Sequence, residues 1–464
     1  MTTTAITGAP AHEEKHPKGL YVLFATEMWE RFSFYSMLAM FTLYLRDTTG
    51  QGFAWSVDSA TALYANYLMF VYASPLIGGW LADRKLGYRK AVMIGGLFFM
   101  AGHLLLSIRS IPVVYLALTC LVIGNGFFKP NVSAMVGNLY SEGSHLKDRA
   151  YNIFYMGINV GAFLAPVTAE IVQRNWGYHP AFAVAAGGMA ISVFILWKFK
   201  RHIQGTDRPG QMSAEEIADS AAVTVDAAPT ATTSRQAELN ATRQNTMDAV
   251  PEWKRIAALI VIFLIVIVFW MVFHQNGSTL TYWANDNTDW KASGIISLAL
   301  NAGWVIILTF PLVAFWRWLD RKGLEPSTPT KMAFGMMLTG LSFFILFIAA
   351  RVGEATVTGS DPYAFKVSPA WLIGAYGVLT LGELMLSPMG LSLVSKVAPI
   401  RFRGVMMGGW FVATAIGNKL TQIGELWDDW LHSTFWLLLS GAALFMAIVL
   451  LVLLKPLKKA MPGV

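Results

Sequence analysis

Twelve stretches of this chain are apolar and about 20 residues long, which is the length that an α-helix needs to cross a lipid bilayer. Only 14% of the residues are charged, against about 25% in soluble proteins. The sequence therefore predicts an all-α polytopic membrane protein and excludes a soluble multidomain enzyme. We expect membrane helices near residues 20–45, 58–82, 90–108, 112–139, 150–172, 181–199, 254–276, 293–317, 331–350, 369–397, 403–426 and 432–454.

A polar segment separates the first six stretches from the second six. This segment, residues 200–252, is rich in Ala, Thr, Ser and Asp, and we interpret it as a cytoplasmic linker with a short surface helix near residues 213–222. The predicted domains are one six-helix bundle at residues 1–199 and a second at residues 253–464. The sequence has one cysteine, Cys120, which excludes an intrachain disulfide and a cysteine-based metal site.

Basic residues are unevenly distributed over the loops. The loops after the second, fourth, eighth and tenth predicted helices hold thirteen Lys and Arg residues, and the opposite loops hold six. Because cytoplasmic loops carry an excess of Lys and Arg, both termini are predicted to be cytoplasmic. The net charge of +7 then reflects this bias and not a nucleic-acid partner. Residues 1–18 lack an apolar core, so we expect no cleaved signal peptide.

Two pairs of similar segments indicate that the second half repeats the first. Residues 80–87, WLADRKLG, follow the second predicted helix, and residues 318–323, WLDRKG, follow the eighth. The fourth and tenth predicted helices each contain a polar residue followed by proline, at residues 129–130 and 387–388. Paired helix interruptions at corresponding places point to the central site of a transporter. We therefore predict a duplicated fold in which both helices are broken at these steps.

Among the charged residues inside predicted membrane helices, five bear on function. Glu27, Glu30 and Arg31 share one face of the first helix, and Lys129 and Glu383 lie in the fourth and tenth. Each charge costs about 2.5–3.5 kcal/mol at a helix centre, so we expect them to face a wet cavity. The alternative for the first helix is a structural pair of Glu27 with Arg31. The five formal charges sum to −3 + 2 = −1. A zwitterionic ligand has no net charge and leaves this sum unchanged, whereas one added proton would bring it to zero.

Four segments carry a family resemblance. Residues 27–35, EMWERFSFY, resemble the ExxERFxYY signature of the proton-coupled oligopeptide transporter family. Segments that resemble its patterns in helices 4, 5 and 10 are FKPNVS at 128–133, FYMGINVG at 154–161 and GELMLSP at 382–388. Residues 79–90 are similar to a loop motif of the wider major facilitator superfamily. The resemblance implies a major facilitator fold of 12 helices in two pseudo-symmetric bundles, and the linker leaves no room for the extra helix pair of many bacterial members.

Members of this family import di- and tripeptides together with protons, so the resemblance implies a secondary active symporter in the bacterial inner membrane. Its substrate site would lie between the bundles, with no cofactor and no metal, and the family is usually monomeric. The positions that would meet the terminal carboxylate of the peptide are Arg31, Tyr35 and Lys129. Those that would meet its terminal ammonium group are Asn159, Asn301 and Glu383.

Further positions match the walls and the proton-coupling groups of the family's transport pathway. Glu27 and Glu30 match positions that couple proton binding to Lys129. We expect Asp83 and Arg84 to form a cytoplasmic gate that is closed in the outward-open state; for the basic residues after Asp83, positive-inside topology is the alternative. For the aromatic wall positions, ordinary helix packing is an equally good interpretation. The matching pocket-wall positions are Tyr72, Tyr155, Trp270, Ser387 and Trp410.

The chain departs from the family pattern at four positions. Leu38 stands where members often have a second basic residue, and Phe273 and His274 stand where its acidic partner is often found. Losing both partners together avoids an unpaired buried charge. Phe34 replaces the first tyrosine of the signature. We therefore expect the Glu27/Glu30 pair to carry the proton; His274 is the alternative, and a hydrogen-bonded polar role for that histidine also fits.

Three other functions are alternatives to peptide import. A transporter of nitrate or another small anion would need Arg31 and Lys129 but has no use for Glu383. A transport-inactive peptide receptor would share the same residues. An intramembrane enzyme is disfavoured, because the eight histidines form no HExxH motif or other ligand-spaced set.

Overall fold

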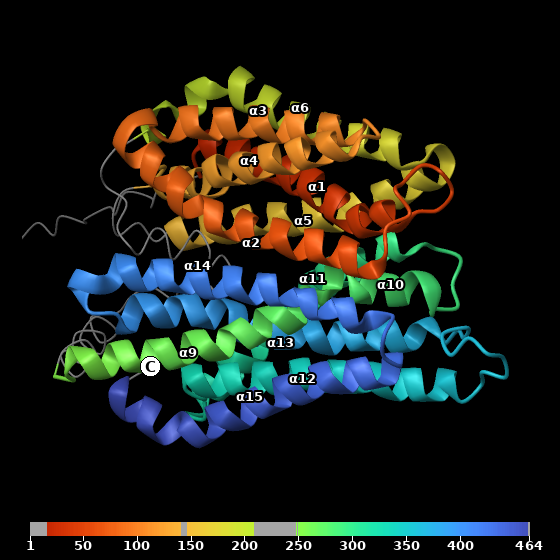
Figure 1. The fold of residues 1–464 in the computed structure, drawn as a ribbon. Helices are drawn as coiled ribbons and strands as arrows, with labels where there is room; N and C mark the ends of the chain where they lie inside the picture. The colour runs from red at the N-terminus through yellow and green to blue at the C-terminus, as the bar shows by residue number, and fades with distance from the viewer. Residues whose placement is uncertain (1–15, 141–145, 208–246, 248, 463–464) are drawn as a thin grey trace, which may run out of the picture.

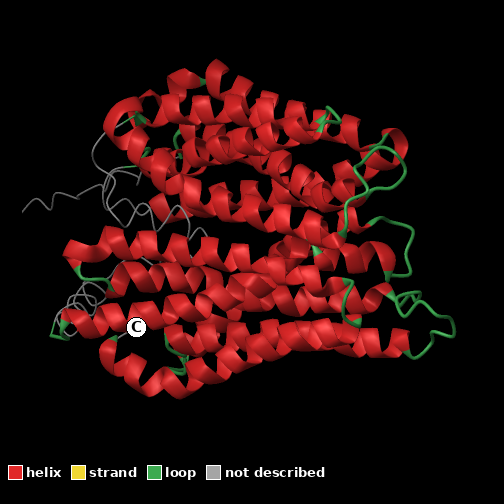
Figure 2. Cartoon of the chain, in the orientation of Figure 1, coloured by secondary structure: helices red, strands yellow, loops and turns green. Residues whose placement is uncertain are grey.

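The computed structural model describes residues 16–140, 146–207, 247 and 249–462, and these residues are almost entirely helical (Figure 2). Within these ranges the β-structure is one isolated bridge between Thr288 and Val367. The described residues form twelve helices of 18 or more residues, namely α1 (Lys18–Arg46), α2 (Val57–Leu81), α3 (Tyr88–Leu106), α4 (Ile111–Gly137), α5 (Leu146–Trp176), α6 (Tyr178–Lys198), α9 (Glu252–Phe273), α11 (Ser297–Arg321), α12 (Thr328–Glu354), α13 (Pro369–Val397), α14 (Arg403–Leu420) and α15 (His432–Ala460).

Nine helical segments of the described chain are both long enough and apolar enough to cross a bilayer. The three long helices outside this set are α1, α2 and α14, whose composition is more polar. In α1 the cause is the charged group Glu27, Glu30 and Arg31 near its centre. The predicted all-α polytopic membrane fold is confirmed, and the expected twelve helices each have a counterpart in the structure.

The helices form two layers, shown in Figure 1. Helices α1–α6 pack on one another, and helices α9 and α11–α15 do the same. The two layers meet where α2 packs against α14 and α5 packs against α11. At one end of both layers lie the ends of α6 and α9, between which the linker runs; we call this end the linker side. The loops 47–56, 287–293 and 355–368 lie at the opposite end, the far side.

Two details of the predicted helices were wrong. The seventh membrane segment does not end at residue 276; α9 ends at Phe273, a 3₁₀ turn, η3 (His274–Gly277), follows, and α10 (Thr279–Asp286) continues the span. The fourth and tenth membrane helices, α4 and α13, are not broken but run through Pro130 and Pro388. Each proline removes one helical hydrogen bond, which membrane helices tolerate. The expected surface helix near residues 213–222 lies outside the described residues.

Paired glycines bring α3 onto α4 and, in the second layer, α12 onto α13. A Cβ added to Gly95 would lie 2.7 Å from the carbonyl oxygen of Gly124, and one added to Gly124 would lie 2.9 Å from that of Gly95. The same reciprocal contact joins Gly335 and Gly382, at 2.7 Å and 2.6 Å. The α4 and α13 glycines each lie six residues before a helix proline, so the repeat that the sequence indicated extends to helix packing.

Candidate functional site

A cavity of about 430 Å³ lies where α1, α2, α4 and α5 face the helices of the second layer. Thirteen of the sixteen residues that we predicted for the site line it; Glu30, His274 and Arg84 do not. A volume of this size suits a small-molecule ligand. The thirteen are Glu27, Arg31, Tyr35, Tyr72, Asp83, Lys129, Tyr155, Asn159, Trp270, Asn301, Glu383, Ser387 and Trp410.

The α1 charges form one compact group. The guanidinium group of Arg31 donates to both carboxylate oxygens of Glu30, at 2.5 Å and 2.7 Å. Arg31 Nε is also 3.4 Å from Glu27 Oε1. Glu30 is fully buried behind Arg31, whereas Glu27 lines the cavity and its Oε2 atom has no hydrogen-bond partner among the described residues. Arg31 is thus held by two carboxylates, of which only Glu27 faces the cavity.

Lys129 and Glu383 face the same cavity from opposite layers. Lys129 Nζ lies over the ring of Tyr72, 5.0 Å from its centroid. In the described parts of the chain no carboxylate oxygen lies within 4.0 Å of this ammonium group. Glu383 accepts a hydrogen bond of 2.9 Å from Asn301 Nδ2, which also donates to Thr380 Oγ1 at 3.1 Å. Lys129 and Glu383 therefore face the same cavity without forming an ion pair with each other.

Aromatic rings close part of the cavity wall. Tyr72 and Trp270 lie on opposite layers with their ring centroids 6.5 Å apart. Trp410 is 4% exposed and packs on α13, where a Cβ added to Gly390 would lie 1.9 Å from its ring. In α5, Asn159 lines the cavity, and its Nδ2 atom donates to the carbonyl oxygen of Tyr155 at 3.0 Å. These rings can contact a ligand without adding charge.

His274 lies behind this wall. Its ring stacks on Trp270 with centroids 5.0 Å apart, and its Nε2 atom is 3.4 Å from the hydroxyl of Tyr72. The Nδ1 atom has no partner among the described residues. The geometry fits the hydrogen-bonded interpretation of this histidine, and its role in proton binding stays a prediction.

Asp83 lies at the linker-side end of the cavity, in the π-helical turn η1 (Ala82–Leu86) that follows α2. Burial raises the pKa of its carboxyl group above the usual value, against a smaller opposite effect of the hydrogen bond from Tyr88. Arg84 is exposed, and its guanidinium carbon lies 5.0 Å from the ring centroid of Trp80. Of the two predicted gate residues, Asp83 thus lines the cavity and Arg84 lies on the exposed surface.

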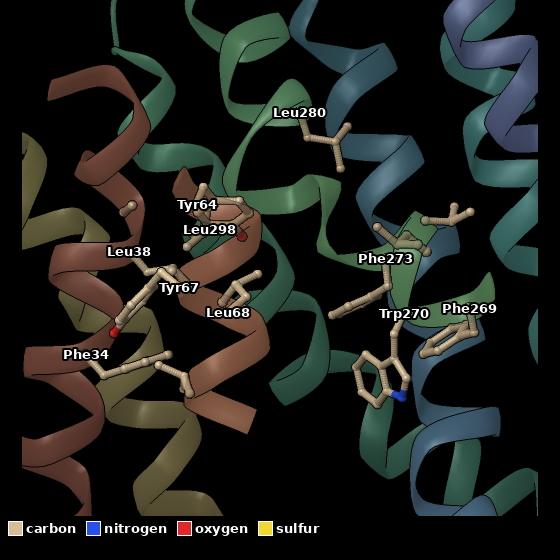
Figure 3. Packing of buried hydrophobic residues seen from close by; sticks show 14 of the residues in the cluster. Phe34, Leu38, Tyr64, Tyr67, Leu68, Phe269, Trp270, Phe273, Leu280 and Leu298 are labelled. Atoms are coloured by element: carbon tan, nitrogen blue, oxygen red, sulfur yellow. The ribbon is translucent and has the colours of Figure 1, made fainter. Parts of the chain in front are cut away.

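The two layers touch on the far side. Thr42 Oγ1 donates to the carbonyl oxygen of Gly277 at 3.0 Å, and the Tyr64 hydroxyl donates to that of His274 at 3.2 Å. Apolar side chains surround these contacts, with Leu38 between α1 and α2 and Phe273 at the end of α9 (Figure 3). The cavity extends instead to Trp80 and Asp83 on the linker side. It is therefore closed toward the far side.

The structure adds lining residues that the sequence analysis missed. Among them are Asn125 on α4, Asn276 in η3 and Thr414 on α14. A signal for Asn125 was available, because it lies one helical turn before Lys129 and so shares its face. Asn276 could not be found in this way, because the change from α-helix to 3₁₀ turn alters the facing of its side chain. The described residues contain no group of three or more His, Cys, Asp or Glu side chains that could hold a metal ion.

The comparisons with known proteins agree with one another. The sequence profile of the POT family matches residues 89–425. The chain is 30% identical to a di-/tripeptide transporter of Lactococcus lactis, with 97% of each chain covered. It is 31% identical to the uncharacterized transporter YclF of Bacillus subtilis, with 97% of this chain and 96% of the relative covered.

Solved structures match over the same length. The crystal structure of a peptide transporter POT in complex with alafosfalin has a TM-score of 0.81 and 30% sequence identity, covering 97% of this chain and 96% of that one. Structures of POT family members thus share the fold of α1–α6 and α9–α15. These relatives are multi-pass membrane transporters and not enzymes. The chain accordingly has the major facilitator fold and belongs to the POT family, the proton-coupled oligopeptide transporters.

Proposed function

We propose that the protein imports di- and tripeptides across the bacterial inner membrane together with protons. The observation that carries this proposal is the pair of opposite charges in one cavity, Lys129 on α4 and Glu383 on α13. A short peptide carries a carboxylate at one end and an ammonium group at the other, so it can pair with both residues at once. Side chains of the peptide would lie against the aromatic wall. The two bundles at 1–199 and 253–464 are proposed to work as a monomer.

The charge arrangement supports a zwitterionic substrate over an anion. Arg31 is already neutralised by Glu30 and Glu27, so Lys129 is the cation available to the substrate carboxylate. Glu383, supported by Asn301, is available to the ammonium group, with Asn159 nearby on the facing wall. A nitrate carrier would gain nothing from Glu383, because a carboxylate repels an anion. The peptide substrates of the relatives agree with this choice.

Glu27 is the better candidate for the coupled proton. It faces the cavity, where water can reach it, and its Oε2 atom lacks a partner among the described residues. Glu30 makes two hydrogen bonds to Arg31 and has no access to the cavity. Protonation of Glu27 would remove one of the two negative charges beside Arg31, which stays paired with Glu30, and would lower the repulsion that a peptide carboxylate meets at Lys129. Proton loss toward the cytoplasm would reverse this step and release the peptide.

The conformation supports alternating access. The layers are in contact on the far side, and the cavity reaches Asp83 on the linker side. With both termini in the cytoplasm, this is an inward-facing state. The outward-facing state would need the far-side contacts to open and the linker side to close, with Asp83 and Arg84 at the closing surface. Rocking of the two bundles about the central site is the motion that the fold allows.

Uptake by purified protein in liposomes tests the proposal. Labelled dialanine should enter saturably under an inside-alkaline pH gradient, and excess unlabelled tripeptide should compete. Lys129→Gln and Glu383→Gln should each raise the KM by about thirtyfold or more, because each leaves one charged end of the peptide unpaired. Lys366→Gln, which changes an exposed lysine, is the matched control.

Two results would contradict the proposal. Binding of dialanine without uptake or counterflow would indicate a receptor. Neither binding nor uptake of dialanine, with uptake of nitrate, would indicate an anion transporter.

A further inference from the structure

One carbonyl group of α2 has lost its helical donor. In an α-helix the carbonyl oxygen of residue 71 accepts from the N–H of residue 75, but residue 75 is proline and has no N–H. The side chain of Asn125, on α4, supplies the replacement: its Nδ2 atom donates to Val71 O at 2.7 Å. Ser74 Oγ donates to the same oxygen at 3.1 Å. The part of α2 next to Pro75 is therefore bonded to α4 through Asn125.

This hydrogen bond fixes the direction of the other amide atom. Asn125 is 2% exposed, and both it and Pro75 line the cavity. Since Nδ2 is held by Val71 O, the Oδ1 atom points away from that carbonyl. No donor to Oδ1 is found in the described parts of the chain. Asn125 thus presents a nearly buried, unoccupied acceptor at the cavity.

The repeat of the fold places this acceptor beside the proposed peptide site. Asn125 follows Gly124 and precedes Pro130 by five residues, and Glu383 follows Gly382 and precedes Pro388 by the same number. Lys129 and Ser387 correspond in the same way, one helical turn later. Both pairs line the one cavity. Asn125 is therefore the first-layer counterpart of Glu383, one turn from the cation that would hold the substrate carboxylate.

We propose that Asn125 is a substrate-binding residue whose Oδ1 atom accepts a hydrogen bond from the peptide-bond N–H group. This inference rests on the proposed function. It adds the peptide-bond N–H to the two charged ends of the substrate that the site is proposed to recognise. In a dipeptide the peptide N–H is attached to the same Cα atom as the terminal carboxylate. When Lys129 holds that carboxylate, the N–H lies within reach of a side chain on the preceding turn of α4. A neutral acceptor suits this neutral donor, as the charged acceptor Glu383 suits an ammonium group.

An ester analogue of dialanine tests the inference. In L-alanyl-L-lactate an ester oxygen replaces the peptide N–H, and both charged ends remain. For the wild-type protein the KM of this compound should exceed that of dialanine by about tenfold, because the nearly buried acceptor is left unpaired. In Asn125→Leu the acceptor is gone, so the two KM values should become equal. Any structural effect of losing the bond to Val71 raises both values by the same factor and leaves their ratio unchanged.

Asn131 on the same helix provides the matched control. It is fully buried, its Nδ2 donates to the carbonyl oxygen of Phe127 at 2.7 Å, and it does not line the cavity. Asn131→Leu should keep the wild-type ratio of about tenfold. An Asn125→Leu protein that keeps this ratio would overturn the inference and leave the proposed function standing. A wild-type protein that transports neither compound would overturn both.

Discussion

Glu27 and Glu30 lie one helical turn apart on α1, yet their surroundings differ. Glu30 makes two hydrogen bonds to Arg31 and is fully buried, and Glu27 lines the cavity with one oxygen unpartnered among the described residues. The periodicity of the sequence places both on one face but does not say which one faces the cavity. The sequence therefore predicts that the Glu27/Glu30 pair carries the proton, but it does not indicate which of the two glutamates binds it.

Exchanging each glutamate for glutamine should separate their roles. Glu27→Gln should lose gradient-driven uptake but keep counterflow of labelled against unlabelled dialanine, because peptide binding needs only the charges of Lys129 and Glu383. Glu30→Gln should lower the free energy of unfolding by about 3 kcal/mol, because it breaks a buried ion pair from one side. Uptake assays and thermal melting of both variants check this. Loss of counterflow in Glu27→Gln would contradict the assignment.

His274→Gln is expected to keep gradient-driven uptake. Its imidazole lies behind Trp270 and Tyr72 and outside the cavity, and glutamine can keep a hydrogen bond to the Tyr72 hydroxyl. Initial uptake rates across a series of pH gradients measure the effect. If uptake no longer responds to the gradient, the histidine carries the proton and Glu27 does not. The sequence alone could not place this ring, because it lies at the change from α9 to the 3₁₀ turn η3.

At the scale of helices, α2 meets η3 through a close contact. A Cβ added to Gly277 would lie 2.2 Å from the hydroxyl oxygen of Tyr64, so only glycine fits while the far side is closed. The sequence did not single out this glycine, since Tyr64 and Gly277 are more than 200 residues apart in the chain. Contacts of this kind depend on the packing of the two layers and not on local pattern.

Gly277→Ala should shift the protein toward the state in which the far side is open. The added methyl group must displace Tyr64, and opening of the layers relieves the clash at no cost to either layer. Spin labels at exposed positions Ser59 and Leu431, in a Cys120→Ala background, report the separation of the layers as a distance distribution. Gly374→Ala is the control, because nothing lies within 4 Å of its added Cβ. An unchanged distribution in Gly277→Ala would argue against this contact as a determinant of closure.

The helix repeat was only partly predictable. The two proline steps correctly aligned α4 with α13, because proline at matched positions is a strong local signal. The same signal suggested breaks that do not occur, since a single lost hydrogen bond does not end a helix that is packed on its neighbours. The glycine contacts that hold α3 on α4 and α12 on α13 involve no charged or polar side chain and left no recognisable motif.

At the scale of the molecule, a set of carboxyl groups meets one arginine on the far side. Arg46 of the first layer lies 3.6 Å from Asp286 of the second, and its guanidinium carbon is 4.2 Å from the ring centroid of Tyr282. Burial raises the pKa of the Asp428 carboxyl above its usual value; Arg46 opposes this, and Asp58, Asp286 and Asp429 add to it. Closing the far side brings these groups together.

Closure of the far side should therefore depend on pH. A raised pKa means that the closed state binds the proton of Asp428 more tightly than an open state in which this group faces water. Lowering the pH toward the titration of Asp428 should thus favour closure, and raising it should favour opening. The Ser59–Leu431 distance distribution, recorded over a pH series, measures this. Asp428→Asn should reduce the dependence, and a variant that keeps it in full would exclude this carboxyl as its source.

The twelve helices and their division into six and six followed from the sequence, because the length of an apolar run and the position of a polar linker are local properties. The boundary of the two domains itself stays a prediction. Which side of the cavity is closed could not be predicted, because inward-facing and outward-facing states share every helix and every motif. Only the far-side contacts, such as that of Thr42 with Gly277, distinguish the two states.

The reciprocal glycine contacts also determine where the molecule is stiff. Backbones that touch at Gly95 and Gly124, and again at Gly335 and Gly382, leave no space for sliding, so each helix pair deforms as one body. Lys129 lies on α4 and Glu383 lies on α13, so each belongs to one of these stiff helix pairs. The molecule therefore deforms most easily where the two layers meet, at the contacts of α2 with α14 and of α5 with α11. Substitutions at the glycines would change the free energy of unfolding, and substitutions at the contacts between the layers would change the rate of transport.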